Sequence, residues 1–137
     1  MAGYVSVGEA RQTVTIRRLT AGDAAVVEQL AEQQPARTAL LADDRVRFVV
    51  AFDADDPVGF ALGYELPRRH GRPTSFFVYE LGVDEPYRRR GIGRRLMAEL
   101  LEGHEKAFVL TEPSNDAANA LYASLGGTRV DSVMWDF

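Results

Sequence analysis

The sequence contains no cysteine, which excludes disulfide bonds, thiolate catalysis and cysteine-based metal sites. Histidine is almost as scarce, because only His70 and His104 occur, and their separation gives no metal-ligand spacing. No apolar run approaches the roughly 18 residues of a membrane-spanning helix, and the N-terminus lacks the apolar region of a secretory signal. We therefore expect a cytoplasmic protein with no metal site and no membrane partner.

A surplus of positive charge is also missing, since 16 lysines and arginines face 20 aspartates and glutamates for a net charge of −4. This balance argues against nucleic acid as a partner. The arginines nevertheless cluster, because five of them lie between Arg88 and Arg95. An acidic protein with one basic cluster suits an anionic cofactor bound beside a cationic substrate.

The length of 137 residues predicts a single domain, with residues 1–12 as a flexible leader and residues 13–137 as the folded part. Strand-like and helix-like patterns alternate, which predicts an α/β or α+β fold with a mixed sheet. The predicted strands are residues 13–19, 47–53, 58–66, 76–83, 107–111 and 128–134. The predicted helices are residues 20–33, 35–42, 96–101 and 117–125.

The most informative stretch, residues 80–96, places a basic glycine-containing loop between an apolar strand and a helix. The first amides of a helix have no intrahelical partner, so this arrangement predicts an anion site. The nucleotide-binding pattern G-x-G-x-x-G is incomplete, because Leu96 stands where its third glycine would be. What is present is Arg88-x-x-Gly91-x-Gly93. The alternative is an ordinary strand-to-helix connection with a solvated basic face.

A second pattern lies downstream, where Asn115, Ala118, Leu121, Tyr122 and Gly126 match N-x-x-A-x-x-L-Y-x-x-L-G. Together with the loop, which resembles the R/Q-x-x-G-x-G/A acetyl-CoA loop, it makes the chain similar to the GNAT acetyltransferase superfamily. The resemblance covers roughly residue 14 to the C-terminus. It implies a mixed, mostly antiparallel central sheet of six to seven strands flanked by about four helices.

Within that superfamily the chain most resembles the aminoglycoside 3-N-acetyltransferases. The pieces that carry this likeness include Phe52-Asp53, Tyr64-Glu-Leu-Pro67, Tyr79-Glu-Leu-Gly-Val83 and Val133-Met134. The resemblance implies acetyl-CoA-dependent transfer of acetyl to the 3-amino group of an aminoglycoside, and hence antibiotic resistance. The segment 101–108 is shorter than is usual in that family.

The resemblance also implies which residues bind acetyl-CoA, the expected co-substrate. The loop would hold the pyrophosphate, the strand before it would run beside pantetheine, and the downstream helix would contact the pantetheine arm and the thioester. These residues are Arg88, Arg89, Arg90, Gly91, Ile92, Gly93 and Arg94 in the loop, Leu81, Gly82 and Val83 in the strand, and Asn115, Ala118 and Tyr122 in the helix. A main-chain N–H near Leu81 or Gly82 is the candidate oxyanion donor.

Two side chains are candidates for acid–base catalysis. Glu80 precedes the reactive end of the cofactor and could take a proton from the attacking amine, and strand alternation predicts that it points away from Tyr79 and Leu81. The alternative for Glu80 is a structural salt bridge in the sheet. Tyr122 is the candidate general acid for the leaving thiolate, and its alternative is a core aromatic residue.

Acidic side chains predict the acceptor site, because a polycationic sugar would be bound by carboxylates. The candidates are Glu80, Glu112, Asp116 and Asp136, and each could instead be a solvated surface acid. Two other functions stay open: acetylation of a protein, peptide or other small-molecule amine, and non-catalytic sensing of acetyl-CoA. The sequence also leaves the oligomeric state open, a homodimer included.

Overall fold

The computed structural model describes residues 14–31 and 35–137, so the predicted leader and the end of the first predicted helix lie outside the described residues. Five strands form one sheet in this part of the chain: β1 (Val14–Arg18), β2 (Val46–Asp53), β3 (Asp56–Arg68), β4 (Gly71–Val83) and β5 (Ala107–Val109). The α-helices are α2 (Ala24–Leu30), α3 (Ile92–Leu101) and α4 (Asp116–Ser124), and short 3-10 helices are η1 (Ala21–Asp23), η2 (Thr38–Ala42) and η3 (Glu85–Tyr87).

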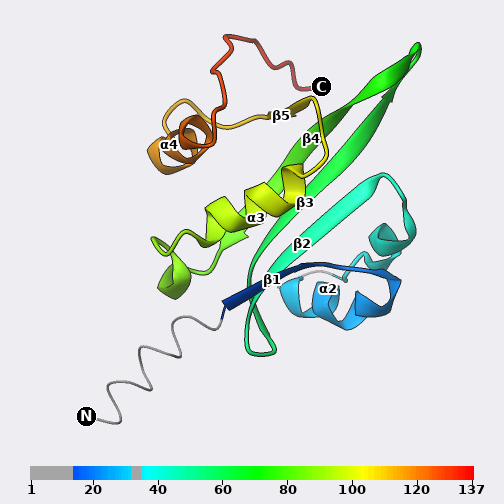
Figure 1. Ribbon diagram of the computed structural model, residues 1–137, viewed down its shortest axis with the longest axis vertical. Helices are drawn as coiled ribbons and strands as arrows, with labels where there is room; N and C mark the ends of the chain where they lie inside the picture. Colours follow the sequence, from blue (N-terminus) through cyan, green and yellow to red (C-terminus); the bar gives the residue numbers. More distant parts are fainter. Residues whose placement is uncertain (1–13, 32–34) are drawn as a thin grey trace.

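The strands lie side by side in chain order, β1-β2-β3-β4-β5. The first three pairings are antiparallel and the pairing of β4 with β5 is parallel, which α3 makes possible as the crossover between them. The predicted mixed, mostly antiparallel sheet of an α+β fold is therefore confirmed. Figure 1 shows the long β3–β4 hairpin extending beyond the other strands.

Apolar side chains cover both faces of the sheet, which explains the continuous apolar run in β2. Val49 and Ala51 point to the face where α3 packs, and Phe48 and Val50 point to the face where α2 and η2 pack. The amphipathic α3 buries Leu96 and Leu100 completely in the first of these cores. Packing therefore fixes α3, and with it the loop at its N-terminus, against the centre of the sheet.

A β-bulge interrupts the pairing of β3 with β4. Leu62 pairs with Glu80 and the next residue, Gly63, pairs with Val78, so Tyr79 is the extra residue. An extra residue resets the alternation of side chains. Gly63 is needed here, because a Cβ at this position would lie 2.3 Å from the ring of Phe76.

Strands β4 and β5 diverge after a short contact, since only Phe76–Val78 pairs with Ala107–Val109. Beyond Val78 the side of β4 that faces away from β3 has no neighbouring strand among the described residues. Figure 1 shows α4 beside the point where β5 ends. This divergence creates the space in which the candidate site lies.

The structure corrects the predicted number of elements. The described residues contain five strands rather than six to seven and three α-helices rather than about four. Residues 128–134 form no strand, because no partner strand supplies hydrogen bonds, and Val133 and Trp135 are 79% and 78% exposed. The predicted helix at 35–42 is only the 3-10 helix η2, because the N–H groups of Leu40 and Asp43 donate to the carbonyl oxygens three residues earlier.

Candidate active site

The loop before α3 presents a row of free backbone amides. Gly91 is the N-cap of α3 in the left-handed conformation (φ 76°), and Arg89 also has a positive φ of 63°. None of the backbone N–H groups from residue 89 to residue 94 donates to an acceptor within the described residues. These amides and the positive end of the helix dipole together make a site for an anion such as a pyrophosphate.

Several arginines of this loop hold the site in place. The Arg88 side chain donates to the carbonyl oxygen of Val83 at 2.9 Å, which ties the loop to the end of β4. Arg94 donates to the hydroxyl of Ser124 at 2.7 Å, which joins α3 to α4, and Arg95 donates to the carbonyl oxygen of Val14 at 3.0 Å. The cluster that the sequence suggested as a charge supply is therefore also a set of tethers.

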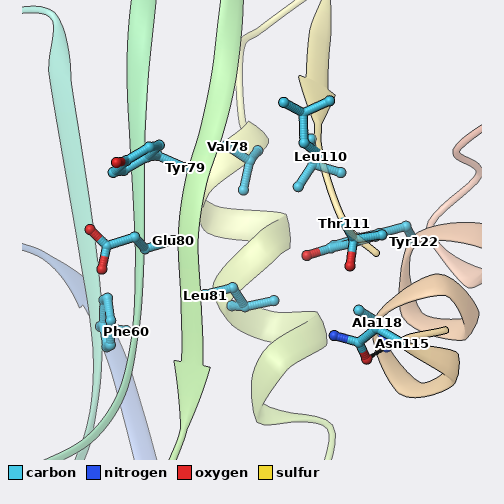
Figure 2. A pocket seen from close by; sticks show the side chains of 11 residues that line it. Phe60, Val78, Tyr79, Glu80, Leu81, Leu110, Thr111, Asn115, Ala118 and Tyr122 are labelled. Carbon is cyan, nitrogen blue, oxygen red and sulfur yellow. Dashed lines mark hydrogen bonds between the residues drawn. The ribbon is translucent and has the colours of Figure 1, made fainter. Parts of the chain in front are cut away.

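A cavity of about 370 Å³ opens where β4 and β5 diverge. Figure 2 shows β4 on one side of it and α4 with the chain after β5 on the other. Its walls come from β3, β4, the end of β5 and the first turns of α4. The lining residues are Phe60, Val78, Tyr79, Glu80, Leu81, Val109, Leu110, Thr111, Asn115, Ala118 and Tyr122.

Tyr122 packs its half-buried ring against the core below α3, while its hydroxyl points across the cavity toward β4 (Figure 2). Burial raises the pKa of this phenol, so it stays protonated at neutral pH. A protonated hydroxyl aimed into a cavity can donate a proton. The two interpretations of Tyr122 are thus compatible, since the ring serves the core and the hydroxyl faces the site.

Asn115 caps α4, because its side-chain oxygen accepts from the N–H of Ala118 at 3.1 Å. This bond directs the amide nitrogen of Asn115 into the cavity toward β4, as Figure 2 shows. The cap therefore leaves a hydrogen-bond donor available to a ligand.

Glu80 lies on the other side of β4 from Tyr122. Figure 2 shows Glu80 and Tyr79 pointing together away from α4, and Val78 and Leu81 pointing toward it. Alternation was therefore right for Leu81 but wrong for Tyr79, because the bulge places Tyr79 and Glu80 on one side. Within the described part of the chain the exposed carboxylate of Glu80 makes no ion pair, so the structural salt bridge is not found.

The other predicted acceptor acids are not gathered by the fold. Glu112 lies in the loop after β5, Asp116 begins α4 and Asp136 lies in the exposed C-terminal segment. None of the three lines the cavity, although Glu112 directly follows the lining residue Thr111. Their predicted role stays a prediction.

Sequence reasoning missed several lining residues, among them Phe60, Val109, Leu110 and Thr111. They carry no motif and reach the cavity only because β3 and β5 lie on either side of β4. The described residues contain no group of three or more side chains suited to holding a metal ion. Nor does this part of the chain include a helix that is both long and apolar enough to cross a membrane.

Comparison with known proteins shows which family has this sequence pattern. Residues 14–126 match the acetyltransferase (GNAT) family model. The chain is 46% identical over 76 residues to the N-alpha-acetyltransferase RimI of Mycobacterium tuberculosis (strain ATCC 25618 / H37Rv), a stretch covering 53% of this chain and 48% of that protein. It is 38% identical over 112 residues to the mycothiol acetyltransferase of Rhodococcus jostii (strain RHA1), covering 81% of this chain and 34% of the relative.

The chain thus spans about half the length, or less, of these curated relatives. Among solved structures, an aminoglycoside acetyltransferase, meta-AAC0020, from an uncultured soil metagenomic sample in complex with sisomicin has the same fold, with a TM-score of 0.80 at 24% identity. The match covers 91% of this chain and 95% of that one. Because the family model spans most of the chain, including the loop and the cavity residues, the protein belongs to the GNAT acetyltransferase family.

Proposed function

We propose that this protein is an acetyl-CoA-dependent N-acetyltransferase. The observation that carries the proposal is the cavity between the diverging strands, with the Tyr122 hydroxyl on one side of β4 and the Glu80 carboxylate on the other. A thioester bound between β4 and α4 would have a proton donor near its sulfur and a base on the side from which an amine arrives. The free amides before α3 provide the anion site that such a cofactor requires.

The cofactor would bind in two parts. The backbone amides of Arg89, Arg90, Gly91, Ile92, Gly93 and Arg94 would hold the pyrophosphate. Arg88 would act through its side chain, which ties the loop to Val83, because its own N–H donates to the carbonyl oxygen of Glu85. The free edge of β4 at Leu81, Gly82 and Val83 would pair with pantetheine as an added strand, because β5 leaves that edge after Val78. Asn115 would contribute the amide nitrogen that its capping bond leaves free.

The chemistry then follows from the residues on either side of β4. Glu80 would take a proton from the substrate ammonium, directly or through water, and release the lone pair for attack on the acetyl carbonyl. A main-chain N–H near Leu81 or Gly82 would stabilise the negative oxygen while the C–N bond forms. As the C–S bond breaks, Tyr122 would donate its proton to the thiolate. The second proton of the attacking nitrogen would pass through water to the tyrosinate, leaving a neutral amide and free CoA.

For the acceptor we propose an aminoglycoside, with the 3-amino group as the reacting amine. The similar solved structure contains the aminoglycoside sisomicin, which supports the class of acceptor without specifying that amine. The second candidate is the amino group of a protein or peptide, which the identity to the N-alpha-acetyltransferase RimI favours.

The test measures release of CoA thiol from acetyl-CoA with sisomicin, with a short peptide that has a free α-amine, and with no acceptor. We expect acceptor-dependent thiol release that falls about 100-fold or more in Glu80→Gln, the lower range for loss of a general base. Turnover with the peptide alone would select the second candidate. If acetyl-CoA binds tightly but neither acceptor causes release of CoA thiol, the protein is a sensor and the proposal of an enzyme is contradicted.

A further inference from the structure

Four aromatic rings form a continuous row across three strands, which we call the aromatic shelf: Tyr64 of β3, Phe77 and Tyr79 of β4, and Phe108 of β5. The Tyr64 and Tyr79 ring centroids lie 5.7 Å apart, edge to face, and those of Phe77 and Tyr79 lie 5.6 Å apart. Phe77 stacks on Phe108 at 4.8 Å with an interplanar angle of 10°. Neighbouring rings at these distances support one another's orientation.

The shelf is open to solvent at two of its rings. Tyr79 is 58% exposed and Phe108 is 43% exposed, whereas Tyr64 and Phe77 are half-buried. Tyr79 is also the extra residue of the bulge, so it lies on the same side as Glu80 (Figure 2). A bulge beside a site commonly re-aims a side chain, and here it turns the Tyr79 ring to the side of β4 on which Glu80 lies.

The negative charge of Glu80 beside the aromatic shelf favours a cationic ligand. The Glu80 carboxylate has no cationic partner among the described residues. Burial first, and then the charge of Glu80, raises the pKa of Tyr64, while Arg37 acts more weakly in the opposite direction. An anion would be repelled here, whereas an ammonium group would be attracted both by the carboxylate and by the negative faces of the rings.

We propose that the aromatic shelf is an acceptor subsite that binds a second ammonium group of a polycationic amine, with Tyr79 as the residue that determines this specificity. The inference rests on the proposed acetyl transfer and adds to it the requirement for an acceptor with at least two ammonium groups. One amine reacts beside Glu80 while another lies over the exposed ring. The hydroxyl of Tyr79 has no part in this contact.

The test compares Tyr79→Leu, which keeps apolar bulk but removes the ring, with Tyr79→Phe, which keeps the ring. Calorimetry with sisomicin on CoA-saturated protein should show binding weakened about fivefold to thirtyfold in Tyr79→Leu, the range expected for a partly desolvated cation–π contact. Tyr79→Phe should stay within about twofold of the unchanged protein. Acetyl-CoA affinity, measured separately, should be the same in all three.

A peptide with a single ammonium group provides the second arm. Its KM should change less than about twofold in Tyr79→Leu, because it has no second cation for the shelf. Unchanged sisomicin binding in Tyr79→Leu, or equal weakening for both acceptors, would overturn the inference. Thiol release with the peptide and no sisomicin binding would overturn it while leaving acetyl transfer in place, whereas absence of acetyl-CoA binding would overturn both.

Discussion

At the scale of single residues, the two parts of the Tyr122 side chain have different surroundings. Its ring contacts the core below α3 and its hydroxyl faces the cavity. Tyr122→Phe removes only the hydroxyl, so we expect thermal stability and acetyl-CoA affinity to change little while kcat falls about 10- to 100-fold. Steady-state kinetics across the pH range provide the measurement. A kcat equal to that of the unchanged protein at every pH would mean that the ring alone matters.

Gly91 supports a second prediction at this scale, because its φ of 76° is one that side chains disfavour, although nothing lies within 4 Å of an added Cβ. Gly91→Val should therefore shift the loop by backbone strain rather than by a clash. We expect a loss of about 1–2 kcal/mol of unfolding free energy and at least a tenfold weaker binding of acetyl-CoA.

Gly103, at the other end of α3, is a matched control for this prediction. It has a φ of 78° and equally open surroundings, so Gly103→Val should lose similar stability. Its acetyl-CoA affinity should remain unchanged, because it lies far from the free amides along α3. Equal loss of affinity in both variants, measured by calorimetry, would show that the loop has no special role in binding.

At the scale of elements, the C-terminus of α3 is held by a cationic and aromatic cluster. Arg47 of β2 donates to the carbonyl oxygens of Leu100 and Glu102 at 3.0 and 2.7 Å, where a helix leaves acceptors free. His104 stacks on Phe76 with ring centroids 4.0 Å apart, and its buried Nε2 has no hydrogen-bond partner in the described residues. These contacts fix the short turn from α3 to β5 and so the place where β5 begins.

This cluster predicts a pH-dependent stability. Burial first, and then the charge of Arg47, lowers the pKa of His104 in the folded protein. The native state then binds fewer protons than the unfolded state, so stability should fall as the pH drops through about 6.5 and level off below the folded pKa. Urea unfolding at pH 7.5 and at steps down to pH 5 measures the effect.

His104→Phe keeps a ring on Phe76 and removes the titration, so it should flatten this slope. The exposed His70, in the turn between β3 and β4, serves as the control, and His70→Phe should leave the slope unchanged. A slope that survives in His104→Phe would assign the pH dependence to other groups.

At the scale of the whole molecule, the net charge of −4 should attract a polycationic acceptor. Added salt screens exposed charges, with a Debye length that shrinks from about 10 Å at 0.1 M to about 3 Å at 1 M. We therefore expect the KM for sisomicin to rise severalfold over that range with little change in kcat. A flat KM would contradict an electrostatically bound acceptor.

Glu112→Gln tests whether the acid beside Thr111 takes part in this attraction. We expect a KM increase of about threefold, a modest value because the side chain is exposed and screened. The control is Glu99→Gln, which changes the net charge equally. Glu99 is exposed on α3 and does not line the cavity, so this variant should have no such effect. Equal KM values in the two variants would remove Glu112 from the acceptor site.

Local sequence determined much of this protein, because its signals act over short distances. Apolar patterns predicted all five observed strands and α4. The structure adds that Asn115 is the N-cap of α4 and that Gly126 after it has the left-handed conformation. The glycine loop and the family resemblance likewise required only neighbouring residues. The helix predicted at 96–101 was too short, because α3 begins at Ile92. Glu80, Asn115 and Tyr122 all line the cavity, and their roles in it stay predictions.

Tertiary structure alone decided which way the side chains of β4 point and what surrounds them. The bulge at Tyr79 depends on pairing with β3, so simple alternation could not place Tyr79 on the same side as Glu80. The cavity exists because β5 pairs with β4 for only three residues, a limit that no motif encodes. The prediction of a strand at 128–134 was wrong for the same reason. A strand forms only where a neighbouring strand accepts and donates its backbone hydrogen bonds, and the tertiary fold decides whether such a neighbour is present.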